Sequence, residues 1–180
     1  MVDVSVIDVF AVDLRLPDGE PVFVTALALH VIAGVWCVVV GATAAFARKR
    51  RGAHPRLGRR YLIGLSVIVA TAVVMATIRW PEDAHLFAIA MVAGSLGLIG
   101  WLARRRRWAG WVRWHAIGMG GSYVALLTGF YVDNGPRLPV WNLLPAEAFW
   151  VLPAIIGTPL IWLALRRFRS GVSARPTRAG

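Results

Sequence analysis

The residues of this sequence best suited to chemistry in an apolar setting are its four histidines, His30, His54, His85 and His115. A neutral imidazole offers one nitrogen lone pair, and it is a common ligand for zinc, copper and iron. Each histidine falls within or just before a different long apolar run. Four ligands on four separate elements indicate a site built between helices, so the depth of each element decides which histidines can meet.

Depth within the apolar runs sorts the histidines into an outer and an inner pair. His30 lies 17 residues before the inner end of its run and His85 lies 18 before its own, so both sit about 26 Å above that end. His54 and His115 lie near the inner face. Alternate helices can face each other across a four-helix bundle, which would bring His30 to His85 and His54 to His115.

Two imidazoles that face each other across a gap suit the axial positions of a b-type haem iron. Gly34 and Gly118 stand close to two of the histidines, and the missing side chains would leave room for a flat macrocycle. The pattern predicts haem b held by paired histidines, and two haems at different depths would carry an electron across the bilayer. The outer pair has the stronger basis, because the apolar run after His54 starts only at Tyr61, about two helical turns too late to reach His115.

The histidine arrangement resembles that of the cytochrome b561 proteins, which hold two haems between four helices, in ligand number and sidedness only. A second interpretation stays open. Small residues allow close helix packing in a bilayer, so the histidines and glycines would serve packing in a non-redox membrane protein. Such a protein would be a small transporter subunit or an assembly partner, with the loop Asp133–Pro145 as its binding surface.

Five apolar runs provide the elements that would position these residues. The chain has 180 residues, 58% of them hydrophobic, and a mean hydropathy of +0.63. Each run is about long enough, at about 1.5 Å per residue, to cross a hydrocarbon layer of about 30 Å. The sequence therefore predicts an all-α, polytopic transmembrane bundle with spans at Pro21–Ala47, Tyr61–Trp80, Leu86–Ala103, Trp114–Val132 and Phe149–Leu165.

The rest of the chain divides around these spans. Residues 1–20 are interpreted as an outer interfacial segment, residues 21–167 as the transmembrane domain and residues 168–180 as a disordered cytoplasmic tail. All basic residues except Arg15, Arg79 and Arg137 follow the first, third or fifth run, whereas all nine acidic residues lie in the other segments. Because basic loops stay in the cytoplasm, the N-terminus is predicted outside and the C-terminus inside a bacterial inner membrane.

Several other functions are disfavoured by the same residues. The net charge of +11 is explained by topology, and no nucleic-acid-binding fold accompanies the basic runs. Cys37 is the only cysteine, which excludes a disulfide framework or a thiolate cluster. No carboxylate lies within a span to relay protons. No catalytic motif appears, so an enzymatic activity is neither predicted nor excluded.

Two stretches of the sequence resemble a known family. They are RGAHPRLGRRY (residues 51–61) and WHAIGMGGSYVALLTGFYVDNGPRLPVWNLLP (residues 114–145). They look like small bacterial membrane proteins described only as a domain of unknown function, over roughly residues 30–167 and most specifically in the second stretch. The resemblance implies a multi-helix inner-membrane protein and no activity. The residues that fall in its motifs are His54, His115, Ser122, Tyr123, Asp133 and Asn134.

Overall fold

The computed structural model describes residues 21–47, 52–139 and 141–173, which are helical with short connections and contain no strand. The elements are α1 (Pro21–Phe46), α2 (Ala53–Ile78), α3 (Ala84–Arg106), α4 (Trp111–Asn134), the 3-10 helices η1 (Gly135–Arg137) and η2 (Trp141–Leu143), and α5 (Ala146–Ser173). The predicted all-α fold with five long helices is confirmed over this part of the chain. The outer segment predicted for residues 1–20 lies outside the described residues.

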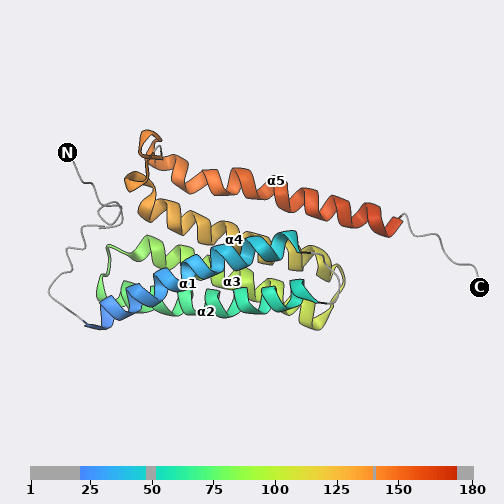
Figure 1. The fold of residues 1–180 in the computed structure, drawn as a ribbon, viewed down its shortest axis with the longest axis horizontal. Coiled ribbons are helices and arrows are strands. Elements are labelled where there is room, and N and C mark those ends of the chain that lie inside the picture. The colour runs from blue at the N-terminus through green and yellow to red at the C-terminus, as the bar shows by residue number, and fades with distance from the viewer. Residues whose placement is uncertain (1–20, 48–51, 140, 174–180) are drawn as a thin grey trace, which may run out of the picture.

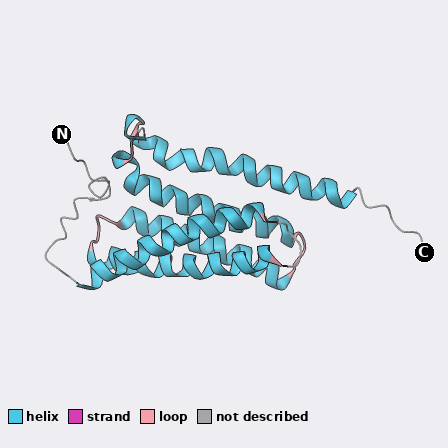
Figure 2. Ribbon diagram, viewed as in Figure 1, coloured by secondary structure: helices cyan, strands magenta, loops and turns pink. Residues whose placement is uncertain are grey.

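Helices α1 to α4 run antiparallel as a four-helix bundle, and α5 lies along the outside of α4 (Figure 1). Short loops join α2 to α3 and α3 to α4 (Figure 2). Contacts are closest within two hairpins, α1 with α2 and α3 with α4, whereas the hairpins touch each other more sparsely. Around the bundle α2 neighbours α3 and α1 neighbours α4. Helix α2 is therefore diagonal to α4, which is the alternate-helix arrangement that the histidine depths require.

Four helices, α1, α2, α3 and α5, are long and apolar enough to cross a membrane. They leave large side chains such as Ile32, Ile63 and Ile155 more than half exposed, an arrangement that lipid favours and water does not. These properties are those of a membrane protein. Helix α4 has 24 residues but is less apolar, because glycine, serine, tyrosine and histidine occur along it. It packs between α3 and α5, and its crossing of the membrane stays a prediction.

The two ends of the bundle differ in charge. All acidic residues of the described part lie where α2 and α4 end or where α3 and α5 begin: Glu82, Asp83, Asp133 and Glu147. We call the opposite end, where α2 and α4 begin, the basic end. Its described arginines are Arg56, Arg59, Arg60, Arg104, Arg105, Arg106, Arg107, Arg113, Arg166 and Arg167.

Two helices extend beyond the boundaries that the sequence predicts. Helix α2 begins at Ala53, about two turns before the predicted start at Tyr61, with Pro55 in the first turn, where its missing N–H costs no hydrogen bond. Helix α5 continues to Ser173, past the predicted boundary at residue 167. Apolar runs mark only what lipid covers, whereas helical hydrogen bonding continues through the arginine-rich ends.

The two glycines predicted to leave room for a cofactor have different surroundings. A Cβ on Gly118 would lie 2.5 Å from the backbone nitrogen of Gly100, so Gly118 is where α3 and α4 bring their backbones together. A Cβ on Gly34 would meet no atom within 4 Å, so Gly34 is not part of a packed site. A glycine in a membrane helix can allow two helices to approach closely, or it can lie on an open surface. Sequence spacing does not distinguish these roles from a cofactor slot.

Candidate functional site

The structure brings His54 and His115 together at the basic end of the bundle. His54 lies in the first turn of α2 and His115 in the second turn of α4, on diagonal helices. Their ring centres are 6.3 Å apart and their ring planes stand at 84° to each other. The contact is possible because α2 begins at Ala53, about two turns before the apolar run starts at Tyr61.

Each ring of this pair is oriented by a backbone carbonyl. The Nδ1 of His54 lies 2.9 Å from the carbonyl oxygen of Ala44 on α1, and the Nδ1 of His115 lies 2.8 Å from that of Gly100 on α3. A carbonyl can only accept, so both Nδ1 atoms carry the proton, and a neutral ring then has its lone pair on Nε2. A second nitrogen held in this way is typical of histidines that ligate metals.

The distance between the two ring centres is close to that of a bis-histidine iron site. Two imidazoles that coordinate one ion from opposite sides at about 2 Å each have ring centres about 6 Å apart, close to the 6.3 Å found here. The two ligands also belong to different hairpins, whose mutual contact is the sparsest in the bundle. The two histidines therefore meet across the contact between the two hairpins.

A polar layer lies above the pair, on the same helix faces. Tyr61 follows His54 by seven residues and Ser122 follows His115 by seven, which is two turns on one face of each helix. The hydroxyl of Tyr61 lies 3.0 Å from that of Ser122, and Ser122 donates to the carbonyl of Met119, so Tyr61 is the donor to Ser122. This hydrogen bond joins α2 to α4 across the bundle.

Tyr123 links α4 to α1. Its hydroxyl donates to the carbonyl of Val38 on α1 at 3.0 Å, and its ring lies 6.2 Å from that of Tyr61. Tyr61 was not predicted as a site residue, and Ser122 and Tyr123 entered only through the family resemblance. The equal seven-residue spacing after His54 and His115 is the sequence signal that identifies the layer.

The outer histidines do not form the predicted pair. The Nδ1 of His30 is 2.9 Å from the hydroxyl of Thr71 on the adjacent helix α2, and the exposed ring of His85 lies 6.3 Å from that of Trp150 on α5. No ring contact joins His30 to His85 in the described part of the chain. Depth placed the two histidines at one level, but the rotation of α1 and the position of α5 direct them to other neighbours.

Asp133 and Asn134 do not belong to this site either. They lie at the opposite end of α4, about 27 Å along the helix from His115. The side-chain amide of Asn134 donates to the carbonyl of Phe130 and to Asp133 Oδ2, and Arg137 donates to the carbonyl of Asp133. These contacts close the turn after α4, which is a local structural role.

The comparisons with known proteins add no assignment. No family model, no curated protein and no solved structure matches this chain. Among the described residues, no group of three or more His, Cys, Asp or Glu side chains could hold a metal ion. The candidate site is therefore the two-histidine pair, and the family resemblance stays a prediction from the sequence.

The hydrogen bond between Tyr61 and Ser122 is expected to stabilise the diagonal contact measurably. Tyr61→Phe removes the donor and keeps the ring, so the free energy of unfolding should fall by about 0.6 kcal/mol, the average for hydrogen bonds between membrane helices, and by no more than about 1.7 kcal/mol. Denaturation in mixed SDS micelles measures this. Ser66→Ala is the matched control, since exposed Ser66 bonds only to Leu62 of its own helix. Equal effects of the two changes would contradict the role given to Tyr61.

Proposed function

We propose that this membrane protein binds one b-type haem through His54 and His115 and serves as an electron carrier. The observation that supports the proposal is the 6.3 Å separation of two rings whose Nδ1 atoms are both held by backbone carbonyls. Haem, when bound, supplies one-electron redox chemistry. The proposal has one haem, where the sequence predicts two, because only His54 and His115 form a histidine pair among the described residues. Electrons would then be exchanged near one face of the membrane.

The chain's own residues would hold and insulate this group. His54 and His115 would hold the haem iron, and the carbonyls of Ala44 and Gly100 would fix their tautomers and ring orientations. Tyr61, which is 2% exposed, and the Tyr123 ring beside it would close the bundle core above the pair and limit water. A low-polarity surrounding of this kind is one of the means by which proteins tune haem potentials.

The proposed setting is the inner membrane of a bacterium. Helix α4 would also cross the membrane and bring the number of crossings to five. It has 24 residues and lies antiparallel between α3 and α5 (Figure 1). The positive-inside rule would place the basic end, and with it the histidine pair, at the cytoplasmic face, with the N-terminus outside. The electron partner would then be a cytoplasmic redox protein or another subunit of a membrane complex.

The deciding experiment is an absorption spectrum of the detergent-purified chain after haem-replete expression, oxidised and then reduced with dithionite. A Soret band with sharp α and β bands on reduction is the expected result, because two strong-field imidazole ligands make the iron low-spin. A protein with no absorption above the aromatic band would overturn the proposal. It would favour the packing interpretation, in which the histidine pair joins two helices in a non-redox membrane protein.

A further inference from the structure

A groove, which we call the wedge, opens between α4 and α5 at the basic end. Its volume is about 890 Å³. The two helices are in close contact deeper in the bilayer, where a Cβ on Gly120 would lie 2.7 Å from the side chain of Ile161. At the basic end α5 continues past the start of α4 (Figure 1).

The walls of this wedge change character along its length. Its deep part is lined by Ile117, Thr158 and Ile161, and its mouth by the tryptophans and arginines of the two helix ends. On α5 the lining runs from Thr158 to Phe168, about 15 Å along the helix axis.

Two arginines are part of the lining at the mouth. Arg113 comes from α4 and Arg166 from α5, and both are exposed. The guanidinium of Arg166 lies over the Trp162 ring at 4.3 Å from its centre, and Trp111 lines the opposite wall. Tryptophan marks the level of lipid headgroups. A guanidinium has five N–H donors and can hold a phosphate while it also stacks on an aromatic ring.

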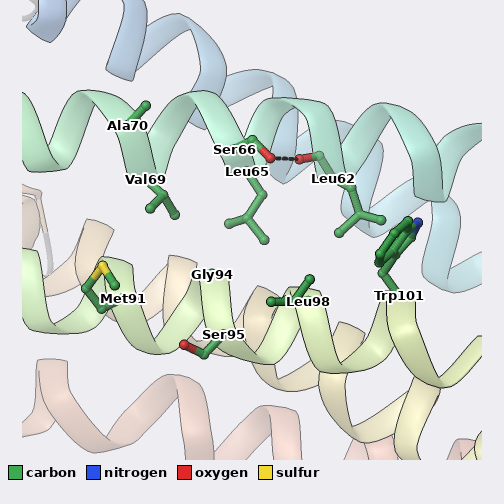
Figure 3. Close-up of a pocket in the computed structure, with 10 residues that line it drawn as sticks. All are labelled: Leu62, Leu65, Ser66, Val69, Ala70, Met91, Gly94, Ser95, Leu98 and Trp101. Atoms are coloured by element: carbon green, nitrogen blue, oxygen red, sulfur yellow. Dashed lines mark hydrogen bonds between the residues drawn. The ribbon is translucent and has the colours of Figure 1, made fainter.

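A second groove in the same bundle lacks these features. It lies between α2 and α3 and has a volume of about 540 Å³. Leu62, Leu65 and Val69 point into it from α2, and Met91, Leu98 and Trp101 lie on the α3 side (Figure 3). None of its lining residues is charged. This groove therefore offers no charged group to a lipid headgroup, whereas the wedge offers Arg113 and Arg166.

We propose that the wedge between α4 and α5 binds one anionic phospholipid of the leaflet at the basic end. Its phosphate lies between Arg113 and Arg166, and one acyl chain follows Ile117, Thr158 and Ile161. The lipid fills the groove between the two helices and links α5 to the four-helix bundle. This inference does not depend on haem binding.

The test is lipid binding to the full-length protein in detergent, measured by native mass spectrometry with phosphatidylglycerol and with phosphatidylcholine of identical acyl chains. Each arginine contributes about 1 kcal/mol of attraction to an anionic headgroup, so phosphatidylglycerol should bind roughly 25-fold more tightly. The double variant Arg113→Gln/Arg166→Gln should bind the two lipids equally. Equal binding of both lipids by the unaltered protein would overturn the proposal.

The matched control removes the same charge at the same end of the bundle but outside the wedge. Arg59→Gln/Arg104→Gln should keep the preference for phosphatidylglycerol, and its loss there would show that surface charge alone attracts the lipid. A second variant, Thr158→Trp, should weaken both lipids by filling the deep part of the wedge. Unchanged binding to that variant would place the lipid elsewhere and would also overturn the proposal.

Discussion

Loss of the haem spectrum is the expected result of replacing either His54 or His115 with alanine. One ligand alone cannot keep the iron low-spin, so the sharp reduced α band should vanish in both variants. The haem content per protein should fall by a factor of about 100 or more, since losing even an outer-shell partner of a metal ligand costs about 10- to 100-fold in affinity. Reduced-minus-oxidised spectra, normalised to protein, give the measurement.

His85→Ala is the matched control for this experiment. The His85 ring is exposed and lies against Trp150 on α5, at the opposite end of the bundle from the proposed site. Its removal should leave the spectrum unchanged. The reverse pattern, in which His85→Ala and His30→Ala remove the haem while His54→Ala keeps it, would return the site to the outer pair and refute the assignment made here.

A single methyl group at Gly118 is expected to disrupt the helix packing. Its Cβ would lie 2.5 Å from the Gly100 nitrogen and 2.7 Å from the Leu96 carbonyl oxygen, and backbone atoms cannot turn aside as a side chain can. Helices α3 and α4 must then separate, which also strains the hydrogen bond between His115 and Gly100. Overpacking of this kind costs about 1 to 3 kcal/mol and sometimes more, so Gly118→Ala should lower the free energy of unfolding in mixed micelles by about 3 kcal/mol.

The same substitution at Gly34 should have the opposite sign. A Cβ there meets no atom within 4 Å, so Gly34→Ala only removes the helix-weakening effect of glycine and should stabilise by about 0.5 to 1 kcal/mol. If both variants lowered stability equally, the loss would come from glycine substitution in general. The assignment of Gly118 to a backbone contact would then be wrong.

The number of helices and the charge of the two bundle ends could be predicted from the sequence, because both depend on local composition. Hydrophobic run length predicted five helices, and the alternation of charge separated a basic end from an acidic end, since both properties accumulate residue by residue along the chain. The same reasoning missed the early start of α2 at Ala53. Hydrophobicity marks the edge of the lipid, and a helix is free to continue past it.

The composition of the site depended on tertiary structure. The sequence alone predicted an all-helical chain with five long apolar segments and a histidine in or just before each of the first four. It could not determine how each helix is rotated about its own axis, and so which side chains face which neighbouring helix. That rotation directs His30 to Thr71, His85 to Trp150, and His54 to His115. Rotation is set by the fit of one helix surface against another, as at Gly100 and Gly118, and such a fit exists only once the helices are packed together.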